Sequence, residues 1–200
     1  ATPGHTNPDS CKLHVNGGTL GADGTLLLVA GNMCPFMVAL FDHVGNAVDG
    51  AEASWTWQCV KVDDAAPGEV DEAALGSNHF APLESSSFRL LTAGTYELHV
   101  NCGDSLVPSA AGVKGAPTMV SVMPSALSVT TSTVYGSGVH SRYPDGVEDE
   151  EREVVLIARD AYGNRLGHSP RELATFSVTL HPVEKAGGKA ATSPASRGPS

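Results

Sequence analysis

The sequence lacks the features that mark membrane-spanning and nucleic-acid-binding chains. Its apolar runs are short, as in the six-residue segment 25–30 of Thr followed by five apolar residues, whereas a membrane helix needs roughly 18. Lys and Arg number 12 against 22 Asp and Glu, and the resulting net charge of −10 repels phosphate backbones. We therefore expect no nucleic acid as a partner, and any membrane contact only through segments outside this one.

Residue patterns that carry catalysis or hold cofactors are also missing. The eight histidines form no H-E-x-x-H or H-x-H pattern, the serines form no G-x-S-x-G elbow, and no glycine pair stands between a strand and a helix. The acidic run 148–153 lacks the spacing of an EF-hand loop and is better explained as a solvated block guarding an edge strand. We predict that the protein is not an enzyme and uses no metal or other cofactor.

The cysteines are few, and they bear on the cellular compartment. Cys11, Cys34, Cys59 and Cys102 are spaced by 23, 25 and 43 residues with no C-x-x-C, which argues against a zinc site. Two disulfides, in any of three pairings, fit this count, and so do four buried thiols in a cytosolic domain. The absence of an N-x-S/T sequon removes one independent sign of secretion, so the count alone leaves the compartment open.

What the sequence does contain is a series of short alternating runs separated by turn residues. It has 22 Gly and 13 Pro, and 41% of its residues are hydrophobic, enough for a core. We expect strands at 12–15, 25–29, 36–42, 54–62, 87–92, 95–102 and 118–123. Their spacing and alternation predict an all-β sandwich, with side chains such as Tyr96, Leu98 and Val100 on one buried face.

A second unit begins near Pro124 and repeats a motif of the first. Asp, two residues and Gly-Asn follow a strand in both units, at an offset of 118 residues. Aspartate can bond the backbone of a tight turn, and Gly and Asn tolerate positive φ, so each copy predicts a strand-to-strand corner. The turn residues are Asp42, Gly45 and Asn46 in the first copy and Asp160, Gly163 and Asn164 in the second. Further strands are expected to start at 127–129 and to span 154–160 and 175–180.

These observations divide the chain into four parts. Residues 1–10 are predicted as an extended lead-in, 11–123 as one complete repeat, 124–181 as part of a second repeat, and 182–200 as a low-complexity linker or disordered tail. The chain opens at Ala1 without a Met or a signal-like segment. We therefore expect an internal segment of a longer repeat-bearing protein.

The motifs resemble filamin-type immunoglobulin-like repeats. The resemblance is carried by Phe-x-Val-x-Leu-x-Asp-x-x-Gly-Asn at 36–46, by Ala-Gly-Thr-Tyr at 93–96 and by the alternating run 117–122. It covers 10–123 as a whole repeat and 124–181 as the first half of another. The long 63–86 region, in which strand D has no defined course, and an extra stretch at 109–115 depart from the pattern.

The resemblance implies a non-catalytic module that binds proteins and contacts neighbouring repeats of its own chain. Filamin repeats accept a partner peptide as an added strand, in a groove between strands C and D. Here that places the binding edge on the exposed side of 54–62, at Thr56, Gln58, Val60, Lys61 and Val62.

The resemblance also leads to a cysteine pairing. In such a sandwich Cys11 opens strand A near the end of strand F at Cys102, and Cys34 precedes strand B near the end of strand C at Cys59. We therefore predict Cys11–Cys102 and Cys34–Cys59 disulfides, which favour an extracellular or cell-surface adhesion module, similar to the filamin-like domains of algal and plant gamete-surface proteins. The alternative is a cytoplasmic scaffold repeat, of the actin-crosslinking or ciliary kind.

Overall fold

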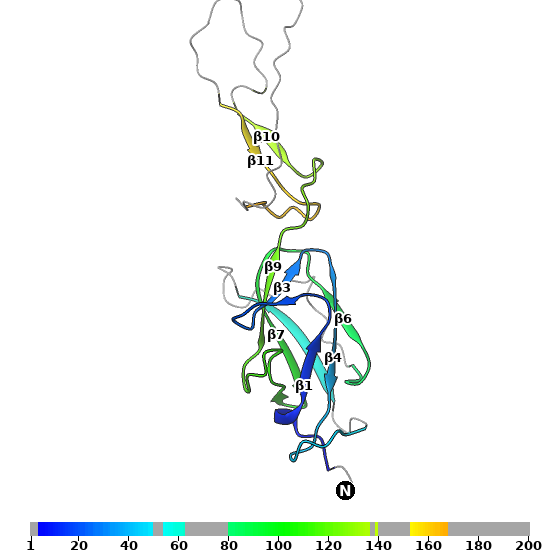
Figure 1. The fold of residues 1–200 in the computed structure, drawn as a ribbon. Helices are drawn as coiled ribbons and strands as arrows, with labels where there is room; N and C mark the ends of the chain where they lie inside the picture. The colour runs from blue at the N-terminus through cyan, green and yellow to red at the C-terminus, as the bar shows by residue number, and fades with distance from the viewer. Residues whose placement is uncertain (1–3, 50–53, 63–79, 137–138, 140–152, 168–200) are drawn as a thin grey trace, which may run out of the picture. The chain divides into compact units, whose positions relative to one another are not determined.

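The computed structural model describes residues 4–49, 54–62, 80–136, 139 and 153–167, and Figure 1 shows their fold. Within these ranges the regular structure is all strand, apart from a single turn of 3₁₀-helix at Pro8–Ser10 in the lead-in. None of the helical structure described is long and apolar enough to cross a membrane. The all-β prediction is confirmed, and the arrangement of sheets is consistent with immunoglobulin-like β-sandwich domains.

Two sheets build the first module, which we define as residues 4–123. The smaller sheet has the order β1 (Lys12–Val15), β4 (Met33–Ala39), β6 (Ser86–Arg89). The larger sheet has the order β2 (Thr19–Leu20), β3 (Leu26–Val29), β9 (Thr118–Met123), β7 (Gly94–Cys102), β5 (Trp55–Lys61), and β8 (Ser105–Leu106) pairs with β7. All of these pairs are antiparallel except β3 with β9. The strand β5 is therefore an edge of the larger sheet.

The core lies between the two sheets because each long strand alternates apolar and polar residues. Along β7 every second residue from Tyr96 to Cys102 is buried. The ring of Phe36 on β4 meets that of Trp57 on β5 edge to face, with the ring centroids 5.8 Å apart, and so joins the sheets. All of the buried hydrophobic side chains among the described residues fall between Cys11 and Val122, so the first module has a core of its own.

The strands expected in this module are all present, with ends that differ by up to three residues. The largest shift concerns the strand expected at 36–42, which spans Met33–Ala39 instead. It ends before Asp42 because the Asp42 backbone N–H bonds Asn46 O at 3.0 Å within a turn. The strands β2 and β8 were not expected, since two residues are too few to show alternation.

The described part of the second module starts at residue 124 and holds one antiparallel pair, β10 (Thr133–Tyr135) with β11 (Val155–Ile157). The prediction of a strand starting at 127–129 is wrong, since Leu127 makes only an isolated bridge to Asp160. Polar side chains bond the backbone there in place of a ladder, with Ser132 Oγ donating to Ser128 O at 2.7 Å. The expected strand at 175–180 and the tail at 182–200 lie outside the described residues.

Tyr96 ties the start of β7 to the turn that precedes it. Its side chain is fully buried, and its hydroxyl donates to Thr92 O at 2.8 Å. A buried tyrosine near the start of this strand, bonded to the backbone a few residues upstream, is the tyrosine corner of immunoglobulin-like sandwiches. The alternating pattern placed Tyr96 in the core, but it did not reveal the bond made by the hydroxyl.

We expect Tyr96→Phe to lower the free energy of unfolding of the first module by about 1 kcal/mol, because one buried hydrogen bond is lost while the ring still packs. Urea denaturation followed by tryptophan fluorescence measures the change. Tyr135→Phe is the control, since Tyr135 is 52% exposed. Equal stability of the two variants would contradict a structural role for the Tyr96 hydroxyl.

Candidate functional site

The first corner is organised around the buried carboxylate of Asp42. Its Oδ1 accepts hydrogen bonds from the backbone N–H of Val44 at 3.0 Å and of Asn46 at 2.8 Å. Its Oδ2 accepts from Asn46 Nδ2 at 2.9 Å and from the Gly4 N–H at 3.2 Å. Gly45 has a φ of 87°, which the turn requires and which a glycine adopts without strain. The carboxylate thus closes the turn and also holds the incoming lead-in.

The second corner has the same bonds around Asp160. Oδ1 accepts from the backbone N–H of Tyr162 and of Asn164, each at 2.9 Å. Oδ2 accepts from Asn164 Nδ2 and from the Ser125 N–H, each at 2.8 Å. Gly163 has a φ of 88°, and the Asp160 N–H bonds Asn164 O at 3.0 Å, as in the first corner. The duplicated sequence motif is therefore a duplicated hydrogen-bonding unit.

Aligning the two copies of the motif in the sequence does not reveal the fourth hydrogen-bond donor of each corner. Gly4 and Ser125 both follow a proline, but they stand 121 residues apart while the corners stand 118 apart. A fixed offset does not align them, because Gly4 stands 38 residues before Asp42 whereas Ser125 stands 35 residues before Asp160. The sequence signal that could have located them is the Pro-x pair ahead of each module.

The corner hydrogen bonds shift the acidity of both aspartates in the same direction. The side chain of Asn46, helped by the backbone N–H groups of Asn46, Gly4 and Val44, holds the pKa of Asp42 far below its usual value, although burial opposes the shift. Burial also opposes the shift at Asp160, but the bonds from Asn164, Ser125 and Tyr162 outweigh it and lower the pKa. Both corners are therefore built for the ionised carboxylate.

Asn164 also joins the second corner to the first module. Its Nδ2 donates to Leu91 O and its Oδ1 accepts from the Ala93 N–H, each at 2.8 Å. The hydroxyl of Tyr162 packs against Gly31 so closely that a Cβ at Gly31 would collide with it. We call these contacts the joint, and all of them lie within one compact unit, Ala1–His168.

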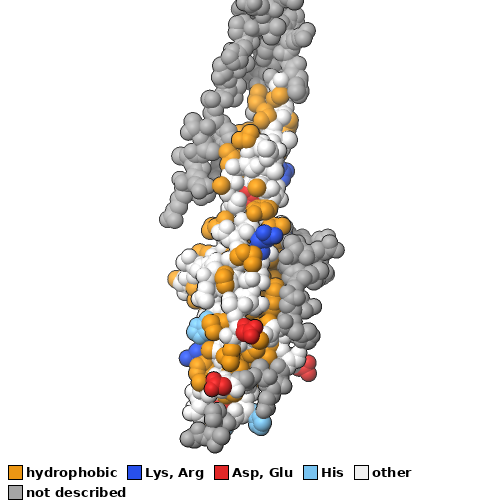
Figure 2. Space-filling view, turned by 90° about the vertical axis from the view of Figure 1, so that its right-hand side faces the viewer, with side chains coloured by type: hydrophobic (Ala, Val, Ile, Leu, Met, Phe, Trp, Pro, Cys, Tyr) orange, Lys and Arg blue, Asp and Glu red, His pale blue; other side chains and the backbone are white. Residues whose placement is uncertain are grey.

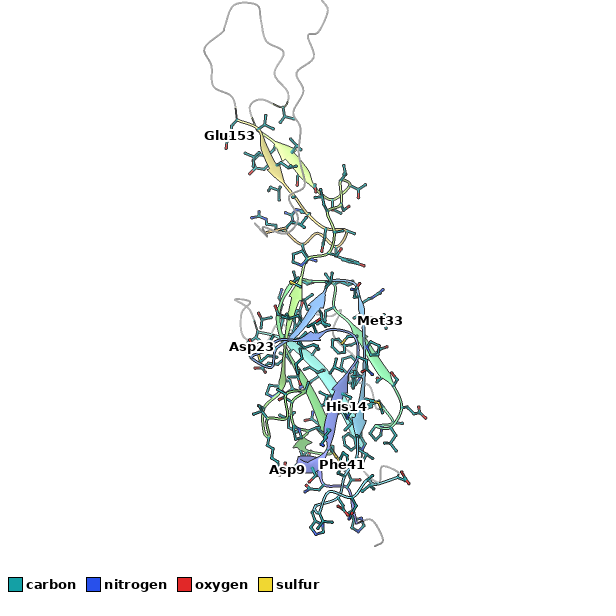
Figure 3. The ribbon with its side chains drawn as sticks, in the orientation of Figure 1. Asp9, His14, Asp23, Met33, Phe41 and Glu153 are labelled. Carbon is teal, nitrogen blue, oxygen red and sulfur yellow. The ribbon has the colours of Figure 1, made fainter. Side chains whose placement is uncertain are left out.

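The joint uses one particular end of the first module. Leu91 and Ala93 lie between β6 and β7, and Gly31 lies between β3 and β4. In Figure 3 Met33, two residues after Gly31, lies toward this end, whereas Phe41 lies at the opposite end near Asp9. The first corner, which follows Phe41, therefore stands at the end away from the joint.

The predicted strand-addition residues lie on the outer edge of the larger sheet. Along β5 the Val62 N–H bonds Thr95 O at 2.9 Å and the Gly103 N–H bonds Ser54 O at 2.8 Å, so even-numbered residues point their backbone groups toward β7. Odd-numbered residues point theirs outward, and at one of them, Trp55, the carbonyl accepts from the Phe80 N–H at 3.3 Å.

Outward backbone groups thus belong to Trp57, Cys59 and Lys61, and no other strand of the described ranges pairs with them. The side chains of Thr56, Gln58, Val60 and Val62 lie on the outer face of the sheet, where they are partly or fully exposed. The opposite side of the predicted groove, strand D, is expected within 63–86, and 63–79 of that region lie outside the described residues.

The four cysteines are free thiols buried in the core, and the structure contains no disulfide among them. Burial raises the pKa of Cys34 to about 11 and, together with the nearby Cys34, that of Cys59 to about 12. Burial, together with the nearby Cys11, likewise raises the pKa of Cys102. The predicted partners thus influence each other electrostatically, while the disulfides themselves stay a prediction.

The described residues show no metal-binding arrangement, since no three His, Cys, Asp or Glu side chains among them come together. One histidine, His99, has its Nε2 3.0 Å from Oε2 of Glu97 on the same strand of the sheet surface. Charged side chains are sparse on the face shown in Figure 2. The absence of enzymatic and cofactor chemistry stays a prediction from the sequence.

We expect the stability of the chain to fall as the pH is lowered below the usual aspartate pKa of 3.8. Both folded-state pKa values are depressed, so the stabilisation is present above 3.8 and is lost as the pH falls toward the folded-state values. Calorimetry between pH 7 and pH 2 measures this as a falling melting temperature. Asp42→Asn should melt lower at pH 7 and lose less on acidification, whereas the exposed control Asp104→Asn should follow the parent chain. An unchanged acid profile in Asp42→Asn would contradict the assignment.

Comparison with known proteins identifies no family, since neither a protein-family model nor a curated protein matches the chain. The filamin resemblance therefore finds no support there. Among solved structures the chain is similar to FdeC, an Escherichia coli adhesin, with 14% identity and a TM-score of 0.46 over 82% of this chain and 45% of that one. It is also similar to domains 5–6 of the S-layer protein SbsC, with 15% identity and a TM-score of 0.33 over 77% of this chain and 67% of that one. The chain thus spans less than half of the adhesin structure.

Proposed function

We propose that this chain is a non-catalytic structural and protein-binding segment, made of β-sandwich modules in tandem and working at the cell surface. The observation that carries the proposal is the joint, in which Asn164 bonds both Leu91 and Ala93 of the preceding module. Side-chain bonds of this kind hold consecutive modules in a defined order, which suits a spacer or adhesive element. The two similar structures come from an adhesin and an S-layer protein, but at TM-scores below 0.5 the proposal rests on the joint.

The partner is an extended peptide that pairs with the outer edge of β5. Backbone groups of Trp57, Cys59 and Lys61 supply the hydrogen bonds of an added strand, and side chains on the outer face, such as Gln58 and Val60, select the peptide. The bond from Phe80 to Trp55 O already occupies the start of this edge. The added strand therefore begins beyond Trp55 and runs toward Lys61.

The register identifies the substitution that tests strand addition. Proline at Gln58 would remove an N–H that faces β7 and would weaken the sheet, whereas proline at Lys61 removes an N–H that faces outward. We expect Lys61→Pro to weaken binding of peptides selected on the parent chain from a random phage-displayed library by about tenfold, since one backbone hydrogen bond is lost.

Lys61→Ala is the matched control, because it removes the side chain and keeps the N–H. Tryptophan fluorescence and circular dichroism establish that each variant is folded. Equal binding by folded Lys61→Pro and Lys61→Ala would overturn strand addition at this edge, and so would a selection that yields no peptide.

The surface location is tied to the two predicted disulfides. Forming Cys34–Cys59 and Cys11–Cys102 removes two hydrogens per bridge, and the two electrons of each pass to a thiol–disulfide oxidant of an oxidising compartment. Each bridge would add about 2–4 kcal/mol to the free energy of unfolding. The observation that favours the alternative, a cytoplasmic cytoskeletal or ciliary scaffold, is that the four thiols are unbonded in the structure.

Non-reducing peptide mapping of protein taken from its native compartment separates the two locations. We expect two linked peptide pairs, one joining Cys11 with Cys102 and one joining Cys34 with Cys59. Alkylation under denaturing conditions before digestion prevents exchange between the thiols. Four alkylated cysteines would count against the surface proposal and in favour of the scaffold. Linked peptides in any other pairing would overturn the predicted pairing but not the surface location.

A further inference from the structure

We propose that the first corner, residues 42–46, is a docking surface for the end of another module of this kind, placed ahead of the first in the chain. The contacts would be the same as those of the joint, except that the first corner would make them in place of the second corner. The inference rests on the proposed tandem organisation and goes beyond it by naming a second interaction surface and the chemistry of its partner.

The side chain of Asn46 is held in the same way as that of Asn164, which makes the hydrogen bonds of the joint. Its Nδ2 donates to Asp42 at 2.9 Å, as Asn164 Nδ2 donates to Asp160 at 2.8 Å. The other N–H and the Oδ1 of Asn164 bond Leu91 O and the Ala93 N–H. The same two groups of Asn46 are exposed and have no partner among the described residues. One hydrogen bond already holds this carboxamide in place, so it loses less conformational entropy when it forms two further hydrogen bonds.

An apolar side chain lies beside Asn46, in the position that a tyrosine occupies in the joint. Val44 corresponds to Tyr162, since each stands two residues after the corner aspartate and donates its N–H to that aspartate. Tyr162 packs against Gly31, whereas Val44 is 66% exposed and covers nothing in the described residues. The exposed valine therefore offers the apolar half of the same contact.

The path of the chain indicates which module would dock. Ser125, which bonds Asp160, stands two residues after the last residue of β9, Met123. The chain that enters the second corner thus comes directly from the module on which this corner docks. Gly4 bonds Asp42 in the same way, so a module joined ahead of Gly4 would bring its own end to the first corner.

The partner surface has a defined chemistry. It must offer a glycine without a Cβ, as at Gly31, and a carbonyl and an N–H two residues apart, as at Leu91 and Ala93. In this chain the second corner already occupies that surface. A second copy of the same chain therefore has no free end to offer, which favours a preceding module.

A tandem chain tests the proposal, with residues 1–123 joined directly ahead of residues 3–200 so that Pro3 follows Met123 as Pro124 does. The leading unit contains all the buried hydrophobic side chains found among the described residues, from Cys11 to Val122. Segmental ¹⁵N labelling of the leading unit makes the hydrogen exchange of its Ala93 N–H measurable by NMR. We expect that N–H to exchange at least tenfold more slowly than in residues 1–123 alone.

Variants in the trailing unit identify the contact. Asn46→Ala should restore fast exchange at Ala93 of the leading unit, the exposed control Asn16→Ala should not, and Val44→Tyr should slow the exchange further. Because Asn46→Ala also removes a bond within its own corner, Val44→Tyr supplies a readout that does not depend on weakening the fold. Fast exchange at Ala93 in the tandem chain, or no response to either corner variant, would overturn the proposal.

Two further measurements separate this inference from the others. Hydrogen exchange of the Ala93 N–H in the natural chain, compared with the Asn164→Ala variant, reports the existing joint. If this N–H is protected in the natural chain but not in the leading unit of the tandem chain, only the docking of the first corner is overturned and the joint stands. Sedimentation of the natural chain over a range of concentrations reports self-association. Self-association abolished by Asn46→Ala would assign the surface to a second copy and would also overturn the proposal.

Discussion

The arrangement of the modules depends on one interaction, the burial of an ionised aspartate at each corner. A carboxylate held out of water must be matched by hydrogen-bond donors, and Asp42 and Asp160 each receive four. Three donors come from the turn and one from the lead-in. The packing of apolar side chains holds the two sheets together, but it is the carboxylate that determines where the incoming chain enters each module.

The asparagine of the corner extends this arrangement from one module to the next. A carboxamide has two N–H donors and a carbonyl acceptor, so Asn164 can bond Asp160 and still bond Leu91 and Ala93. An aspartate in its place has no donor, and a serine has only one. Asn46 carries the same capacity, and this is why a short motif that closes a turn can also join modules.

The sequence located the residues of the proposed binding edge more closely than it described their chemistry. Alternation placed Thr56, Gln58 and Val60 on one outward face of a strand, and the structure has them on the outer face of β5. Which backbone groups point away from the sheet depends on the register with β7, and that register brings together residues some forty positions apart. Local sequence patterns also could not show which cysteines lie near each other, because the packing of the two sheets determines their neighbours.

By itself the sequence determined which residues are buried and where the chain turns. Both are local properties, since a period of two along a strand and an Asp-x-x-Gly-Asn turn involve only near neighbours. Tertiary structure alone decided what the corners hold, since Gly4 and Ser125 bond aspartates 38 and 35 residues away and Asn164 bonds Leu91 across 73 residues. Such contacts depend on how the strands and turns pack in three dimensions, and alternation and turn motifs do not specify which distant residues that packing brings together.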